Sequence, residues 1–165
     1  MLFISEELGI ERFEPRPSKY TDEPVVWAID AERLRNYLLP RECPRVTYYA
    51  CPTSDPEEVE RFLGKSKAVV AIESGWFGRV RACRLCCYHF PADTFECLDE
   101  CAGYFVSRVP VTAIRVDIYD DLITELLGRG VELRFLPSLW SLHDAVAASS
   151  LQFSMIRMQR ALPRP

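Results

Sequence analysis

Three arginines in proline-containing loops are the residues whose type and setting best suit them to bind an anion. Arg16 stands between two prolines, and Arg41 and Arg45 belong to the segment PRECPR. A guanidinium group presents a planar fork of donors that matches phosphate or carboxylate, and restricted backbone would hold that fork in place. The arginines could instead be structural and tie the loops together. The acidic residues available for such pairs are Glu14, Asp30 and Glu42.

Trp27 and Glu73 are two further candidates, each within or at the end of an apolar run. Trp27 lies in VVWAI, and its indole could line a pocket or pack in the core. Glu73 ends the run at 67–73, where it could be a positioned carboxylate of a site or a cap for the turn that follows. Both interpretations stay open for each residue.

Four cysteines have a spacing that could complete a zinc site, namely Cys83, Cys86, Cys97 and Cys101. The segment 81–90 around the first pair is typical of a strand, in which neighbouring side chains alternate between faces. Cys83 and Cys86 would then point in opposite directions, and no glycine next to them can form the turn that brings two thiolates to one ion. We therefore predict no metal site and interpret these cysteines as small apolar packing residues.

Cys43 lies in PRECPR between two arginines, whose charges would favour its thiolate if the thiol were exposed. A nucleophilic thiol also needs a base, and the histidines are His89 and His143. We expect His89 on the same strand face as Cys87 and His143 within a helix. Nothing in the sequence brings either histidine next to Cys43, so we expect an ordinary thiol.

The composition is that of an ordinary globular protein, with 48% hydrophobic and 27% charged residues. The net charge of −4 and the lack of a dense basic stripe argue against nucleic acid as a partner. No apolar run approaches a membrane span, and the start MLFISEELG lacks a signal-peptide pattern. With seven cysteines and no export signal, we expect a cytoplasmic protein with free thiols. The glycine-rich, HExxH and GxSxG motifs are absent.

The elements that must position these residues follow from the apolar pattern and the turn residues. Strands are expected at 1–4, 25–29, 45–50, 67–73, 81–90, 103–107, 111–119 and 131–136. Helices are expected at 31–39, from a cap at Ser54 to Leu63, at 122–130 with Asp120 as cap, and at 138–149. Their irregular order predicts one α+β domain, residues 1–165, with a mixed or antiparallel sheet of about seven or eight strands and about four helices.

Five segments together resemble a family of small bacterial proteins known only as a domain of unknown function. These segments are VVWAID, PRECPR, GYFVS, VELR and SSLQFSMIRM. The resemblance runs roughly from Leu2 to Ala161, which is almost the whole chain, and it implies no established activity.

The order of elements also resembles small ADP-ribosyltransferases of the rifamycin-modifying and RNA 2′-phosphotransferase types. The strand and helix of VVWAIDAERL carry this resemblance, together with the order Ser, Arg, hydrophobic, Pro at Ser107–Pro110. It implies an ADP-ribosyltransferase-like fold with NAD as cofactor, Trp27 facing the nicotinamide and Ser107 in the binding site. Glu73 would stabilise positive charge at the sugar carbon. The anionic groups would be held by Arg16, Arg41 and Arg45.

One position departs from the family pattern. Members of the uncharacterised family have a histidine shortly after the first hydrophobic pair, where this chain reads Phe3–Ile4–Ser5. Isoleucine cannot hold a ribose hydroxyl or a carboxamide, so Ser5 would have to substitute for the imidazole.

The sequence therefore predicts a domain that binds an NAD-like nucleotide or another small anionic ligand, on a transferase-like scaffold whose catalysis is impaired. We expect Arg16 and Arg41 to share a concave site, because their loops flank the strand of Trp27 and the helix after it. The alternative is a non-catalytic binding or protein-interaction module in which the same residues are structural. The sequence specifies no oligomeric state.

Overall fold

The computed structural model describes residues 1–100 and 102–164, and the chain forms two compact units. Unit 1 consists of Met1–Tyr37 and Arg84–Asp120, and unit 2 consists of Leu38–Cys83 and Asp121–Pro165. Each unit is therefore built from two separate stretches of chain. That residues 1–165 act as a single domain stays a prediction.

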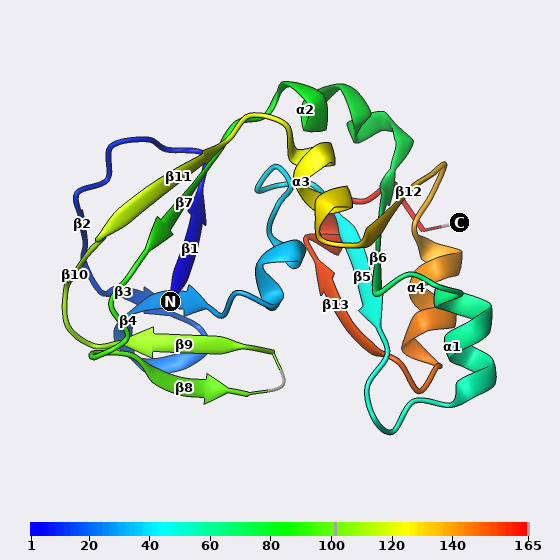
Figure 1. Ribbon diagram of the computed structural model, residues 1–165, viewed down its shortest axis with the longest axis horizontal. Helices are drawn as coiled ribbons and strands as arrows, with labels where there is room; N and C mark the ends of the chain where they lie inside the picture. The colour runs from blue at the N-terminus through cyan, green and yellow to red at the C-terminus, as the bar shows by residue number, and fades with distance from the viewer. Residues whose placement is uncertain (101, 165) are drawn as a thin grey trace. The chain divides into compact units, whose positions relative to one another are not determined.

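Unit 1 is a seven-stranded sheet in the order β11-β7-β1-β4-β9-β8, with β3 also paired to β4, and a separate pair β10-β2 (Figure 1). All pairings in unit 1 are antiparallel. The elements are β1 (Leu2–Ser5), β2 (Arg12–Phe13), β3 (Arg16–Ser18), β4 (Thr21–Ile29), the 3-10 helix η1 (Arg33–Asn36), β7 (Leu85–His89), β8 (Glu96–Asp99), β9 (Tyr104–Ser107), β10 (Val111–Thr112) and β11 (Arg115–Tyr119).

Strand β4 is central in this sheet, as the apolar run VVWAI predicts. It pairs with β1, β9 and β3. Val25, Val26, Ala28 and Ile29 are buried, whereas Trp27 is half-buried. Trp27 therefore lies on a strand in the middle of the sheet.

The two faces of the seven-stranded sheet differ because side chains alternate along each strand. One face carries Phe3, Val26, Ala28, Cys86 and Tyr88, which form a hydrophobic cluster with Phe13, Phe90 and Val111. We call this the core face. The opposite face carries the residues between them, including Trp27, Ile29, Cys87 and His89, and we call it the Trp27 face.

Unit 2 is a four-stranded mixed sheet in the order β12-β6-β5-β13, in which only β12 and β6 are parallel. Helices α1 and α4 pack on the sheet face that carries Val46, Tyr48 and Val69. The elements are β5 (Arg45–Tyr49), α1 (Pro56–Leu63), β6 (Ala68–Glu73), the 3-10 helix η2 (Ser74–Trp76), α2 (Phe77–Ala82), α3 (Leu122–Gly128), β12 (Val131–Leu136), α4 (Trp140–Ala147), β13 (Gln152–Ile156) and the 3-10 helix η3 (Met158–Arg160).

The α+β prediction is confirmed, since residues 1–100 and 102–164 form four α-helices and a sheet of seven strands. Among the described residues, no helix is both long enough and apolar enough to cross a membrane. The sequence missed the short strands β2, β3 and β8, because two to four residues are too few to show alternation. The single strand expected at 111–119 is two strands, β10 and β11, separated by residues 113–114.

Two predicted elements are shorter than expected. The helix at 31–39 reduces to the 3-10 helix Arg33–Asn36. The strand at 81–90 is wrong in its first part, because α2 continues to Ala82 and β7 begins at Leu85. Cys83 therefore ends a helix and does not share a strand face with Cys87, so the argument from strand alternation fails there.

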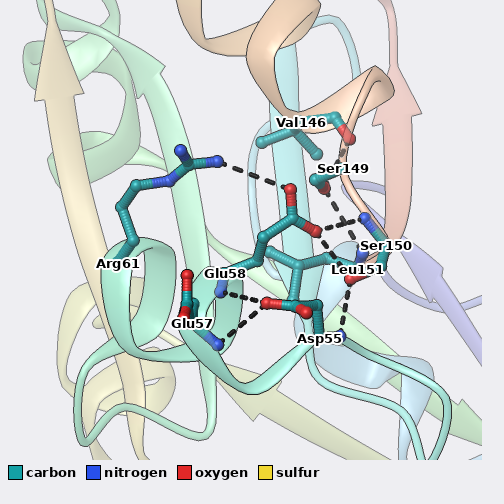
Figure 2. A network of polar contacts seen from close by, with 8 residues as sticks. All are labelled: Asp55, Glu57, Glu58, Arg61, Val146, Ser149, Ser150 and Leu151. Carbon is teal, nitrogen blue, oxygen red and sulfur yellow. Dashed lines mark hydrogen bonds and ion pairs between the residues drawn. The ribbon is translucent and has the colours of Figure 1, made fainter.

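The start of α1 is anchored by a network that also includes the loop before β13 (Figure 2). Asp55 Oδ1 accepts hydrogen bonds from the backbone N–H groups of Glu57 and Glu58, at 2.9 and 3.1 Å. Glu58 Oε2 accepts from the N–H and hydroxyl of Ser150, at 2.7 and 2.6 Å. The cap predicted at Ser54 is wrong by one residue, since that hydroxyl accepts from Cys51 N–H instead. Likewise, Asp121 rather than Asp120 caps α3.

Replacing Asp55 by alanine is expected to lower the free energy of unfolding by about 0.5–2 kcal/mol, because two helix N–H groups lose their acceptor. Urea denaturation followed by circular dichroism measures the change. The matched control is Glu57→Ala, in which the backbone donor remains, and it should change stability by less than about 0.5 kcal/mol. Equal losses in the two variants would contradict a capping role for Asp55.

Candidate functional site

A cluster of aromatic rings surrounds Trp27 in unit 1. The rings of Tyr20 and Tyr104 stand nearly perpendicular to the indole, with centroids 6.4 and 5.8 Å from it. The Tyr37 hydroxyl donates to the Tyr104 hydroxyl at 2.9 Å. Tyr20 is 72% exposed, and the ammonium group of Lys19 lies 4.9 Å from its ring centroid. These rings form a partly open aromatic surface on which a planar group could stack.

Arg16 lies on the same side of the sheet as this cluster. In the β3–β4 pair Arg16 is opposite Val25, and Val25 and Trp27 share a face because they are two residues apart. Arg16 is exposed, and within residues 1–100 and 102–164 its guanidinium forms no hydrogen bond or ion pair. Its predicted alternative partner, Glu14, accepts instead from Arg12 Nε at 2.6 Å. The structure thus brings together two of the residues that the sequence singled out.

A second polar group on the Trp27 face was not predicted from the sequence. His89 Nε2 lies 2.8 Å from Asp117 Oδ2, and Arg115 donates to both oxygens of Asp117 at 2.8 and 2.5 Å. The hydrogen bond from Arg115, more than that from His89, holds the pKa of Asp117 below its usual value. A carboxylate fixes the orientation of the imidazole, which is the arrangement that proton transfer requires. No sequence pattern indicates this pair, because His89 and Asp117 come together only through the pairing of β7 with β11.

Ser5 and Ser107 lie on the core face and not with Trp27. Ser5 is paired with Cys86, and Ser107 is paired with Val26. The Ser107 hydroxyl is buried and donates to Val109 O at 3.0 Å, and Ser5 Oγ accepts from Glu7 N–H at 3.0 Å. Both hydroxyls serve turns that follow their strands.

Arg45 and Glu73 are buried inside unit 2, where backbone groups occupy them. Arg45 Nη1 donates to the carbonyls of Pro40 and Cys43, at 3.0 and 3.1 Å. Glu73 accepts from the Leu162 N–H at 3.1 Å through each oxygen. Arg45 stabilises the loop before β5, and Glu73 holds the C-terminal segment. The Glu73 side chain makes no cap hydrogen bond to the turn after it, so the expected cap is not seen. Burial also means that each charge needs the partners it has.

Arg41 is the exposed arginine of PRECPR, and its carbonyl accepts from Arg157 Nε at 3.3 Å. Glu42, the acid beside it, pairs with Arg157 and Arg160. Arg41 belongs to unit 2 and Arg16 to unit 1. That these two arginines share a concave site stays a prediction.

Three cysteines of the candidate zinc motif lie in different parts of unit 1 and unit 2. Cys83 follows α2, Cys86 lies on β7 and Cys97 is exposed on β8. Cys101 lies outside the described residues. In the part of the chain that is described, no three His, Cys, Asp or Glu side chains gather as a metal site would require.

Two other cysteines differ in the ionisation of their thiols. Burial raises the pKa of Cys43 to about 12 even though Arg45 is close. Cys51 precedes α1, with its sulfur 3.3 Å from Ser54 Oγ and 3.2 Å from Thr53 Oγ1. Hydrogen bonds from Ser54 and then Thr53 lower the pKa of Cys51 to about 7. The thiol of Cys43, expected to be ordinary, is therefore unreactive. The readily ionised thiol is that of Cys51, which no pattern in the sequence indicated.

Alkylation by iodoacetamide should accordingly modify Cys51 rapidly at pH 7, with a rate that rises through a midpoint near pH 7, because the thiolate is the reacting form. Cys43 should stay unmodified in the folded protein. Peptide mapping by mass spectrometry measures both rates. Ser54→Ala should slow modification of Cys51 several-fold at pH 7, whereas the exposed control Ser141→Ala should not. Similar rates at the two cysteines would contradict this assignment.

The comparisons with known proteins identify a family and no function. The chain matches no curated protein and no solved structure. The resemblance to ADP-ribosyltransferases therefore receives no support from them. A family model described as "Family of unknown function (DUF6886)" matches residues 2–161. Because this match covers nearly all of the sequence, the chain belongs to that family of unknown function.

Proposed function

We propose that unit 1 binds a small ligand that carries both a planar ring and an anionic group, with an NAD-like nucleotide as the leading candidate. The observation that carries the proposal is the placement of Arg16 beside the Trp27 cluster on one face of one sheet. Both halves of such a ligand then have a matching group on the protein within the same unit.

The arginine supports the anionic half of the proposal. Exposed arginines on this surface commonly pair with a carboxylate, as Arg12 does with Glu14 and Arg108 does with Glu96. Arg16 has no such partner among the described residues. Its short strand begins directly after Pro15 and contains Pro17, so the backbone that carries the guanidinium is restricted. A phosphate could accept two parallel hydrogen bonds from it.

The aromatic cluster supports the planar half. Tyr20 keeps 72% of its surface exposed, although a tyrosine ring is usually at least partly covered. Stacking of a base on an aromatic ring contributes about 1–3 kcal/mol and requires little sequence-specific geometry. The His89–Asp117 pair occupies the same face. His89, Leu2, Ile29 and Tyr104 lie side by side on four neighbouring strands, so His89 and Tyr104 are three strand spacings apart, roughly 14 Å.

The proposal covers binding and does not extend to group transfer. Ser5 and Glu73 were the candidate catalytic residues, and each hydroxyl or carboxylate is engaged by backbone N–H groups of its own unit. Binding without catalysis also agrees with the replacement of the expected histidine by the Phe3–Ile4–Ser5 segment.

Titration calorimetry with NAD, ADP-ribose and inorganic phosphate tests the proposal. NAD or ADP-ribose should bind more tightly than phosphate, because only the nucleotides also contact the aromatic cluster. Arg16→Ala should weaken nucleotide binding by about 1.5–3 kcal/mol, a loss of about 10- to 150-fold in affinity.

The matched control is Arg12→Ala, which removes an exposed arginine of the same unit that already pairs with Glu14. It should leave the affinity unchanged. Trp27→Phe keeps an aromatic ring. It should weaken the binding of NAD and ADP-ribose but leave the binding of phosphate unchanged. If none of the three compounds binds, or if Arg16→Ala and Arg12→Ala behave alike, the proposal is wrong.

A further inference from the structure

Strand β11 is an edge strand of the seven-stranded sheet. It pairs with β7 through five residues, from Arg115 opposite His89 to Tyr119 opposite Leu85. Its other side has no strand partner among the described residues. The backbone groups along such an edge are a template on which another strand can pair.

The side chains of this edge protect it only in part, through the opposite charges of Arg115 and Asp117. Val116 and Ile118 are 40% and 47% exposed, and they lie on the same side because they are two residues apart in the strand. They continue the core face, since Val116 is opposite Tyr88 and Ile118 is opposite Cys86. The edges of soluble sheets usually carry lysine, proline or a bulge, and none of these occurs within Arg115–Tyr119.

The hydrogen-bonding direction of β11 follows from its neighbours. Just after β7, Phe90 N–H donates to Met1 O at 2.8 Å, and the Met1 nitrogen donates to Phe90 O at 3.1 Å. Because backbone groups alternate in direction along a strand, the N–H and C=O groups of even-numbered residues in β7 point to β1. Odd-numbered residues of β7 therefore face β11, where their partners are Arg115, Asp117 and Tyr119. The backbone groups of Val116 and Ile118 consequently point to the open edge.

The sequence of this edge is complementary to itself. In an antiparallel pair of two copies centred on Val116, Val116 is opposite the partner's Val116. On the other face, Arg115 is opposite the partner's Asp117, and the reverse contact repeats by symmetry. Val116 would form a hydrogen-bonded pair, as its outward backbone requires. Opposite charges directly across a strand pair stabilise it.

Moving the two-fold axis by one residue along the strand removes this match. If the pair were centred on Asp117, that carboxylate would lie opposite the partner's Asp117, and Arg115 would lie opposite the partner's Tyr119. Like charges directly opposite one another destabilise a strand pair. The register centred on Val116 is therefore favoured over its neighbour by charge.

We infer that the occupant of this edge is a second copy of the chain, and that two β11 strands pair antiparallel about a two-fold axis at Val116. The contact is isologous, as in most homodimers, so it closes after two copies and does not propagate. It joins two seven-stranded sheets into one and covers the exposed apolar stripe of each copy. It also places the partner's Arg115 next to the Asp117 that holds His89.

Sedimentation equilibrium over a range of concentrations tests the pairing with two single charge reversals. Arg115→Asp places a new carboxylate opposite the partner's Asp117, and Asp117→Arg places a new guanidinium opposite the partner's Arg115. Each variant alone should dimerise at least tenfold more weakly than the wild-type chain. An equimolar mixture should regain dimers, because every cross-strand pair in the mixed dimer is then of opposite charge. This rescue separates loss of pairing from loss of folding.

Val116→Lys adds a charge at the centre of the edge and should give a monomer with an unchanged circular dichroism spectrum. The matched control is Thr94→Lys, which adds the same charge at an exposed position of unit 1 away from β11. A wild-type chain that stays monomeric at the highest concentration would overturn the inference. So would dimers that are insensitive to both charge reversals, or a mixture that dimerises no better than the single variants.

Discussion

Strand β1, only four residues long, connects the two halves of the sheet in unit 1. It pairs with β7 along its whole length and with β4 through Leu2 opposite Ile29. This double pairing joins what would otherwise be two smaller sheets into one. It also fixes the register, so that side chains of all strands alternate between the same two faces. The hydrophobic cluster can then cover a single face, and the remaining side chains, including Trp27 and His89, are presented together on the other.

Local patterns made part of this arrangement predictable. The apolar runs of β4, β6 and β12 are long enough to show strands, and Gly64 ends α1 with a positive φ, as a helix stop should. The groupings of residues on the Trp27 face depend on strand pairing instead. Arg16 shares a face with Trp27 because the short strand β3 pairs with the following strand β4. His89 meets Asp117 because β7 pairs with β11, which lies 26 residues or more further along the chain.

Chemically identical residues acquire different roles here according to burial. Arg45 and Arg16 both lie beside prolines, yet Arg45 is buried and its Nη1 donates to two carbonyls, whereas Arg16 is exposed without a protein partner among the described residues. Cys43 and Cys51 differ in the same way, because burial raises the pKa of the first thiol and hydroxyl donors lower that of the second. Sequence identifies the functional group, but the free energy of its charged form depends on surroundings that only the fold supplies.

The division of each unit into two stretches of chain affects the order in which the protein can form on the ribosome. Unit 1 lacks β11 until synthesis has reached Tyr119, and by then β5 and β6 of unit 2 have already emerged without β12 and β13. Domains made of one continuous stretch can fold one after another during synthesis. Here β6 can pair with β5 as soon as both have emerged, but its other edge stays open until β12 appears in the last third of the polypeptide.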